Sequence, residues 1–517
     1  MRIGIDVGGT NTDAVLLDGN KVLAGVKQPT SPDVTAGIVS ALTLLKEQYR
    51  FAPAEVSAVM IGTTHFINAL IEARRLAPTA ALRLGLPATA SLPPLVGWPP
   101  SLVAALKART YLAHGGHEFD GRHIAELDRD EIKAQAADMA AHGIRSVAIS
   151  SVFSPINTEF EKAAAEILTE ELGDSVAISL SHEIGRIGLL ERENATIINA
   201  ALRELAQQIT DALIGAVRDQ GITAPVYLSQ NDGTLMDIDY TRQYPVATFA
   251  SGPTNSMRGA AALSGVGTCA VIDLGGTTSD IGVLNNGFPR EATGEVSVAG
   301  VRTNFRMPDV LSIGIGGGSH VEAGGLAVGP TSVGYQLTER ALVFGGGEFT
   351  ATDAAVALGY ADIGDASLVA TLSRSEAKAA LETVAKAITA AVERMRISAD
   401  PLPVVAVGGG SILLPDVLPD LGEVHRPEHF AVANAIGAAI AQVSGEVDRV
   451  YAIPDGQRDR IVAEAKEEAI DKAVAAGANP NDVAVVDFDE VPLPYVPGNA
   501  TRIRVKAVGE LVMEEAR

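Results

Sequence analysis

The sequence predicts an α/β protein, and with 517 residues it is long enough for two to four domains. One segment occurs twice: residues 3–17 read IGIDVGGTNTDAVLL and residues 270–284 read AVIDLGGTTSDIGVL. Apolar strand patterns alternate with helical ones, as where the strand at 56–61 is followed by a helical segment. Beyond about residue 445 the pattern changes to alanines at helical spacing and then an alternating strand at 501–508.

Composition and charge exclude some classes of partner. Forty Lys and Arg residues stand against 63 Asp and Glu residues, a net charge of −23, which disfavours nucleic acid and anionic membranes as partners. Hydrophobic residues make up 47 % of the chain, enough for a large core. The single cysteine, Cys269, cannot form an internal disulfide, and its apolar surroundings predict a buried small residue and not a nucleophile.

The start of the chain and its hydropathy bear on location. Met1 runs directly into a strand with no basic leader, and no apolar run is long enough to cross a membrane. These observations predict a cytoplasmic protein.

Each copy of the repeated segment reads strand, Asp, Gly-Gly-Thr, strand, which predicts a β-hairpin with a glycine tip. Turned backbone N–H groups and hydroxyls bind anions, so the tips are predicted to bind phosphate. The predicted phosphate-binding residues are Gly8, Gly9, Thr10, Asn11 and Thr12, and Gly275, Gly276, Thr277 and Thr278. Asp6 and Asp273, at matching strand ends, are predicted to hold Mg²⁺. The alternative is a pair of ordinary Gly-Gly hairpins, which the match between the copies disfavours.

These hairpins resemble the two phosphate loops of the actin, sugar-kinase and heat-shock ATPase superfamily. Residues 404–415, VVAVGGGSILLP, are similar to its adenosine loop, with Gly408, Gly409 and Gly410 against the nucleoside. The resemblance implies ATP as cosubstrate. It also implies two ribonuclease-H-like domains around a central cleft.

A second turn indicates which family of this superfamily the sequence resembles. Residues 62–70 read GTTHFINAL, a Gly-Thr-Thr turn entering a helix, where free N–H groups favour an anion, and His65 and Asn68 share a helix face. This turn and the opening Asp-Val-Gly-Gly-Thr motif resemble the hydantoinase A/5-oxoprolinase family. The family implies substrate contacts from Thr63, Thr64 and Asn68 and a catalytic role for His65. Taken alone, His65 reads more simply as a packed histidine.

Other segments carry the same resemblance. Residues 182–200 are similar to a family segment, although their Glu and Arg residues read more simply as a charged helix face than as a catalytic base. Asn231 and Asp232 follow a strand in a polar turn, where α/β sheets place ligands, and are predicted to contact substrate. Ser251-Gly252-Pro253 matches a family motif, but residues 254–256 depart from the expected run of small residues.

A histidine-rich turn follows at residues 114–121. His114, His117, Glu118 and Asp120 lie close together around glycines, and imidazole with carboxylate suits zinc or manganese. The turn therefore contains a candidate second metal site. A polar turn without a metal is the other interpretation.

The resemblance implies an ATP-dependent hydrolase that opens a cyclic amide such as a hydantoin, 5-oxoproline or a lactam by phosphorylating its oxygen. Asp13 and Asp280 would order the loops or the attacking water. The rival hypotheses are an ATP-using subunit of a ketone carboxylase and a regulatory module without turnover. A separately encoded partner subunit and a homo-oligomer are both consistent with the family. The implied domains are residues 1–175 with the first phosphate loop, 176–445 with the second phosphate loop and the adenosine loop, and a small α+β domain at 446–517.

Overall fold

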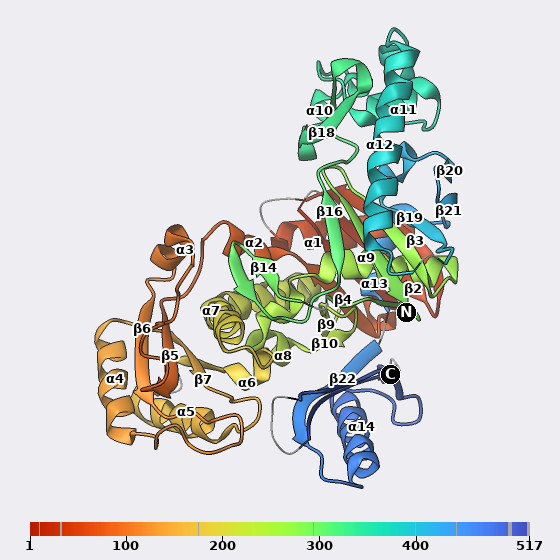
Figure 1. Ribbon diagram of the computed structural model, residues 1–517. Helices are drawn as coiled ribbons and strands as arrows, with labels where there is room; N and C mark the ends of the chain where they lie inside the picture. The colour runs from red at the N-terminus through yellow and green to blue at the C-terminus, as the bar shows by residue number, and fades with distance from the viewer. Residues whose placement is uncertain are drawn as a thin grey trace.

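The computed structural model describes residues 1–9, 11–30, 34–173, 175–292, 294–398, 400–440, 442–494 and 499–513. Over these residues the protein is α/β, as the sequence predicts, with three larger sheets and helices packed against them (Figure 1).

The first sheet contains both ends of the described chain. Its strand order is β23-β24-β22-β10-β9-β4-β1-β2-β3. The strands are β1 (Arg2–Val7), β2 (Asn11–Asp18), β3 (Lys21–Pro29), β4 (Ala58–Thr63), β9 (Val226–Ser229), β10 (Leu235–Met236), β22 (Gln442–Ala452), β23 (Ala484–Pro492) and β24 (Ala500–Glu510). Helices α1 (Val34–Gln48), α2 (His65–Ile71) and α7 (Leu189–Asp219) pack against it. On α1 the apolar stripe of Ile38, Leu42 and Leu45 is fully buried.

The second sheet is built around the second copy of the repeat. Its order is β13-β12-β11-β19-β21-β20, and β16 pairs with β12. The strands are β11 (Cys269–Leu274), β12 (Ser279–Asn285), β13 (Phe288–Pro289), β16 (Val310–Ile313), β19 (Val404–Val407), β20 (Val417–Leu418) and β21 (Gly422–His425). Helices α11 (Ala351–Leu358) and α12 (Arg374–Met395) complete its core. Cys269 is fully buried, so the prediction of a buried cysteine is confirmed, and burial raises the pKa of its thiol to about 12.

A separate lobe, at the left of Figure 1, contains a parallel sheet in the order β6-β5-β7-β8. Its strands are β5 (Thr79–Leu86), β6 (Arg109–His114), β7 (Ser146–Ser151) and β8 (Ala177–Leu180). Helices α4 (Arg129–Ala141) and α5 (Glu159–Leu172) bury apolar residues against this sheet.

Two glycine-containing helices connect the first two sheets. These are α9 (Ser251–Ser264) and α13 (Ala433–Ala438). A Cβ at Gly259 of α9 would collide with the Ala433 carbonyl, and one at Gly437 of α13 would collide with the Asn255 carbonyl. Gly4 of β1 likewise has no room for a Cβ beside the Ala435 carbonyl. The small residues therefore let the two helices approach each other and β1 at backbone distance.

The described part of 446–517 contains α14 (Arg458–Ala475) and strands that extend the first sheet, since β22 pairs with both β10 and β24. Ion pairs fix this segment to the rest of the chain: Lys506 lies 2.8 Å from Asp232, and Arg306 lies 2.8 Å from Asp448. The α+β content matches the sequence interpretation, while the domain boundaries stay predictions.

The shorter elements are α3 (Pro100–Ala105), α6 (Ser181–Ile184), α8 (Ile238–Gln243), α10 (Leu337–Arg340), β14 (Val296–Val298), β15 (Val301–Thr303), β17 (Ser319–Glu322) and β18 (Ala327–Ser332). Within the described ranges, no helix combines the length and hydropathy that a membrane crossing needs.

One interpretation of the sequence is wrong. The acidic and basic residues near the start of α7 do not form a solvated face, because Arg192 and Glu193 are buried at 0 % and 2 % exposure. Glu193 pairs with Arg83, which is itself buried, at 2.5 Å. Helical periodicity could not reveal this, since the partner lies 110 positions away in the chain.

Candidate active site

The two copies of the repeat form the predicted hairpins, and they do so in the same register. β1 and β2 pair so that Asp6 faces Asp13, and β11 and β12 pair so that Asp273 faces Asp280. Each tip is closed by the first glycine: Gly8 N–H donates to the Asn11 carbonyl at 3.0 Å, and Gly275 N–H donates to the Thr278 carbonyl at 2.9 Å. Thr10 lies outside the described residues.

The equivalence extends to the neighbouring parallel strands. β4 runs beside β1 with Gly62 opposite Asp6, and β19 runs beside β11, with Gly408 following Val407, the residue opposite Asp273. A Cβ at Gly62 would collide with the Asp6 carboxylate, and one at Gly408 would collide with the Asp273 carboxylate. Both glycines thus leave space for a carboxylate at the strand end.

We expect Gly62→Ala to lower the free energy of unfolding by ~1–3 kcal/mol, because the new methyl group must displace Asp6 or Asn255. Gly408→Ala adds backbone strain, since Gly408 has φ +82°. Gly9→Ala is the matched control, because a Cβ there has nothing within 4 Å. Urea unfolding measures all three, and equal stability of Gly62→Ala and Gly9→Ala would contradict the argument.

Helices α9 and α13 hold the two strand-end aspartates relative to each other. Asn255 Nδ2 donates to Asp6 Oδ1 at 3.2 Å, and the hydroxyl of the next residue, Ser256, donates to Asp273. Ser256 Oγ also lies 2.7 Å from Asn434 Oδ1 on α13. Because Asn255 and Ser256 are adjacent, one turn of helix sets the spacing of two carboxylates that are 267 positions apart.

The electrostatics of this cluster favour a bound cation. Burial, and after it the charge of Asp13, raise the pKa of Asp6 to about 6. Burial also raises the pKa of Asp273. Beside Asp6, the buried Oδ1 of Asn255 has no hydrogen-bond partner among the described residues. The buried carboxylate of Asp6, the half-buried one of Asp273 and an unpaired amide oxygen fit a hard divalent ion such as Mg²⁺, which prefers oxygen ligands.

The second aspartate of each hairpin has a different partner. Asp13 is buried and accepts hydrogen bonds from Lys27 Nζ at 2.8 and 3.0 Å, which oppose the effect of burial on its pKa. Asp280 is half-buried and accepts a hydrogen bond from Ser312 Oγ at 2.5 Å. Burial raises the pKa of Asp280 to about 6, against the lowering effect of Ser312. The two equivalent aspartates therefore differ in their contacts, a serine hydroxyl for Asp280 and a lysine for Asp13.

Glycine backbone surrounds the second tip. Gly317 N–H donates to the Gly275 carbonyl at 3.0 Å, and Gly318 N–H donates to the Gly276 carbonyl at 2.7 Å. A Cβ at Gly410 would lie 2.8 Å from the Gly275 carbonyl, so the predicted adenosine loop packs directly on the second phosphate loop. Gly409 is exposed with open space beside it. The glycine-rich run at 314–318 supports the phosphate loop.

The Gly-Thr-Thr turn lies at the end of β4, one strand from Asp6. Thr63 Oγ1 is 2.5 Å from His65 Nδ1 and also accepts from the His65 backbone N–H at 3.3 Å. Burial, with a smaller effect of Arg75, lowers the pKa of His65 to about 4, so the imidazole is neutral at pH 7. Asn68 is exposed and donates to Thr64 Oγ1 at 3.3 Å.

The other two predicted substrate residues are engaged within the protein. Asn231 Nδ2 donates to the Val246 and Arg306 carbonyls at 3.0 and 3.2 Å, and its Oδ1 accepts from Ala250 N–H at 2.7 Å. Lys506 holds the pKa of Asp232 below its usual range, although burial alone would raise it. These contacts position α9 and β24.

The predicted second metal group is not brought together as a set. His114 is exposed and lies 3.1 Å from Glu131, and Asp120 pairs with Arg122 at 2.8 Å. Glu118 is exposed. His117 instead turns inward, toward residues that the sequence analysis did not include.

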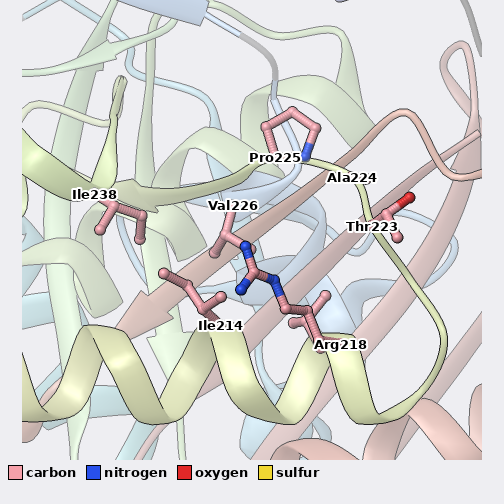
Figure 2. Close-up of a pocket in the computed structure, with 8 residues that line it drawn as sticks. Ile214, Arg218, Thr223, Ala224, Pro225, Val226 and Ile238 are labelled. Atoms are coloured by element: carbon pink, nitrogen blue, oxygen red, sulfur yellow. The ribbon is translucent and has the colours of Figure 1, made fainter.

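Two small pockets lie away from these loops. Figure 2 shows one, of about 140 Å³, between the end of α7 and the start of β9, with Ile214, Arg218 and Val226 in its wall. The other, of about 190 Å³, involves Arg75 and Glu204. Neither is lined by a phosphate-loop residue, and both are smaller than ordinary ligand sites of ~300–1,000 Å³.

Sequence reasoning missed the residues that hold the aspartates in place. These are Lys27, Asn255, Ser256, Ser312 and Asn434. One signal was available, because the polar pair Asn255-Ser256 stands where small residues were expected. Nothing local indicates what that pair contacts.

Comparisons with known proteins identify the family of this chain. The model of the hydantoinase/oxoprolinase N-terminal region matches residues 2–172, and the hydantoinase/oxoprolinase model matches residues 192–365. Caprolactamase subunit alpha of Pseudomonas jessenii is 28 % identical over 469 residues, covering 85 % of this chain and 65 % of that protein. The acetophenone carboxylase gamma subunit of Aromatoleum aromaticum is 29 % identical over 398 residues, covering 69 % of this chain and 53 % of that one.

Two solved structures share the fold. The ATP-dependent caprolactamase from Pseudomonas jessenii has a TM-score of 0.80 at 20 % identity, covering 100 % of this chain and 88 % of that chain. A nucleotide-free acetone carboxylase structure has a TM-score of 0.70 at 17 % identity, with the same coverage. The chain spans between about half and two thirds of the curated relatives it matches. The two family models and the shared fold show that this chain belongs to the hydantoinase/oxoprolinase family.

Proposed function

We propose that this chain uses ATP and Mg²⁺ to open a cyclic amide of the hydantoin, 5-oxoproline or lactam type. The observation that carries the proposal is the pair of equivalent hairpins whose strand-end aspartates, Asp6 and Asp273, are spaced by Asn255 and Ser256 of α9. Such a pair presents two sets of turned N–H groups to one polyphosphate and two carboxylates to the Mg²⁺ bound with it. The name of one relative, caprolactamase, supports the substrate class.

The proposal includes the arrangement of the fold. The first and second sheets would be the two ribonuclease-H-like halves of an actin-like ATPase, with the nucleotide in a cleft between the hairpins and adenosine against Gly408, Gly409 and Gly410. Support comes from the repeated strand–hairpin–parallel strand unit in both sheets. Thr277 and Thr278, which lie at the second tip, would bind phosphate.

The chemical step follows from the weakness of an unstrained amide as an electrophile. The amide oxygen attacks the γ-phosphorus, and the bond to the departing ADP oxygen breaks, which makes the amide carbon electrophilic. Water adds to that carbon, the C–N bond breaks to release the amine, and a second water releases phosphate. The bound Mg²⁺ would neutralise phosphate charge, held by Asp6 and Asp273. The side chains of the protein would align the reacting groups and transfer protons.

Two side chains are proposed to act on the reacting groups. Asp280, half-buried with a pKa raised to about 6, would accept the proton of an attacking water. His65 would contact the amide together with Thr63, Thr64 and Asn68 from the turn one strand away from Asp6. Because His65 is neutral, it would donate or accept a hydrogen bond there without carrying charge.

We expect His65→Ala to reduce amide-dependent turnover more than it reduces ATP binding. Removing one hydrogen-bond donor to charge that develops in the reacting amide lowers kcat by ~10²–10³-fold. Melting temperature and amide-dependent ATP hydrolysis are measured on one preparation. Lost stability with normal turnover per folded molecule would show a packed histidine.

A partner subunit is part of the proposal. Relatives are named as subunits of caprolactamase and acetophenone carboxylase, and this chain covers 65 % and 53 % of those two subunits. The same ATP site would serve a ketone carboxylase, so ketone with bicarbonate is the second substrate class to test. Whether the chain also forms a homo-oligomer, and its cytoplasmic location, stay predictions.

The test is ATP consumption with different second substrates. ATP·Mg²⁺ at a hundredfold excess over Kd is expected to stabilise the protein by ~2.7 kcal/mol, seen as a raised melting temperature. Hydrolysis stimulated by a cyclic amide, alone or with the neighbouring gene's product, supports the amidase. Stimulation by ketone with bicarbonate supports the carboxylase instead, and no effect of ATP·Mg²⁺ on melting overturns the nucleotide site.

A further inference from the structure

A buried histidine in the four-stranded lobe has no partner for its polar atoms. His117 follows β6 and has an exposed fraction of 0 %. Its backbone N–H donates to the Val152 carbonyl at 3.1 Å, and its ring stacks on Phe160 with 4.5 Å between ring centroids. Neither ring nitrogen has a hydrogen-bond partner among the described residues. Leaving a buried polar group unpaired is unfavourable, so a ligand for this ring would remove that penalty.

Two further ligand-type side chains point toward the same place. His123 pairs with His117 as an antiparallel bridge across the turn, and their rings meet edge to face at 5.1 Å. Glu159 is the first residue of α5, and its Oε2 lies 4.0 Å from His123 Nε2. One ligand atom from each of His117, His123 and Glu159 falls within 4.8 Å of the others. The three residues come from two elements, the turn after β6 and the start of α5.

The orientation of His123 suits a metal ligand. Its Nδ1 lies 2.9 Å from Glu126 Oε1, so the carboxylate fixes Nδ1 as the protonated nitrogen and leaves the lone pair on Nε2. That nitrogen is the one nearer Glu159. Metal-bound histidines commonly have such a carboxylate on the other ring nitrogen.

We propose that His117, His123 and Glu159 form a binding site for a divalent cation of the zinc class. Two imidazoles and one carboxylate are the donor set of three-ligand zinc sites that keep one position for water. Tetrahedral zinc with bonds near 2.0–2.1 Å separates its ligand atoms by about 3.4 Å. The Glu159 side chain is 61 % exposed, so rotation about its own bonds can bring its oxygen in.

This site is separate from the phosphate loops. The lobe with β5, β6, α4 and α5 lies at the left of Figure 1, whereas β2 and β19 lie at the right. The cation would join the turn after β6 to the start of α5, and its binding therefore stabilises this lobe without requiring ATP. The sequence predicted a metal in this turn, but with His114, Glu118 and Asp120 as the other ligands; the structure replaces them with His123 and Glu159.

The experiment is a metal titration of the full chain, produced without a histidine tag, freed of metal by a chelator, and kept in excess Mg²⁺. Co²⁺ is the spectroscopic probe and Zn²⁺ the competitor. The expected result is one equivalent of Co²⁺ bound with the visible absorption of a low-coordinate site, displaced by Zn²⁺, and a melting temperature that rises with Zn²⁺. Elemental analysis of the protein as purified gives the stoichiometry.

Variants distinguish this site from adventitious binding. His123→Gln and Glu159→Gln are expected to abolish the Co²⁺ spectrum, and Glu126→Gln is expected to weaken binding by about 10–100-fold. His114→Gln is the matched control, because this exposed histidine of the same turn pairs with Glu131. Asp273→Asn tests the phosphate-loop site and is expected to leave the spectrum unchanged.

Melting of each variant in chelator shows whether it folds like the parent. The proposal is overturned if folded His123→Gln and Glu159→Gln bind Co²⁺ like the parent, if His114→Gln or Asp273→Asn removes the spectrum, or if the parent binds no stoichiometric metal.

Discussion

Asp273→Asn is expected to abolish the Mg²⁺-dependent part of ATP binding while leaving the fold intact, and Asp6→Asn is expected to do the same. Each change removes a carboxylate from the proposed cation site but keeps an oxygen that can accept from Ser256 or Asn255. We expect at least a hundredfold loss of affinity for ATP·Mg²⁺, about 2.8 kcal/mol. Isothermal titration with and without Mg²⁺ measures it directly.

The same variants have an opposite effect on the protein without ligand. The pKa of Asp6 is raised to about 6 in the folded protein, above its value in the unfolded chain. The folded state therefore binds this proton more tightly, and above pH 6 the ionised carboxylate destabilises the fold. In Mg²⁺-free buffer at pH 8, Asp6→Asn is expected to melt at a higher temperature than the parent.

A surface change provides the control for both measurements. Asp120→Asn removes an exposed carboxylate of the histidine-rich turn and is expected to change neither ATP·Mg²⁺ affinity nor its Mg²⁺ dependence. If Asp6→Asn and Asp273→Asn also bind ATP·Mg²⁺ like the parent, the aspartates are structural and the proposed cation site is wrong.

Asp280→Asn is expected to reduce turnover by ~10²–10⁴-fold with ATP binding retained, the loss typical of a removed general base. Asp280 must be ionised to accept a proton, and burial raises its pKa to about 6. The parent's rate should therefore rise as pH rises through about 6 and level off above it, and the residual rate of the variant should lack this step. Single-turnover ATP cleavage with a cyclic amide, from pH 5 to 8, measures both.

Ser312 provides a second, independent readout of the same role. Its hydroxyl lies 2.5 Å from the Asp280 carboxylate and lowers the pKa of that group. Ser312→Ala is expected to raise the pKa and shift the rate step to higher pH, with full activity recovered at pH 8. An unshifted profile in Ser312→Ala, or normal turnover in Asp280→Asn, would show that Asp280 does not transfer the proton.

The equivalent position in the other hairpin should respond differently. Asp13 is buried and pairs with Lys27, whose side chain is 35 % exposed, so Asp13→Asn removes the ion pair and leaves the lysine in contact with water. We expect the pH step of the parent to persist in this variant, because Asp13 is not the proposed proton acceptor. The contrast between Asp13 and Asp280 is a consequence of tertiary contacts, since the two residues occupy the same position in the repeat.

The sequence was sufficient for the features that depend on neighbours along the chain. Both hairpins form in the register that their Asp, Gly-Gly and Thr positions predict, because glycine tips and apolar strands act over a few residues. The stripe of Ile38, Leu42 and Leu45 faces the core, and Cys269 is buried, because hydrophobic periodicity reports which side of an element is covered.

Only the tertiary structure could decide what each covered side faces. Asn255 and Ser256 set the spacing of Asp6 and Asp273. His117 lies near His123 and Glu159, and not in a group with its sequence neighbours Glu118 and Asp120.

The sequence by itself determined the α/β elements and the two hairpins, because local propensity and hydrophobic pattern act over short distances along the chain. The tertiary structure decided that Asp13 pairs with Lys27 and that burial raises the pKa of Asp280 to about 6. It also decided that His123 and Glu159 lie near His117. Those properties depend on burial and on charges brought together from distant positions, and no pattern within one segment contains them.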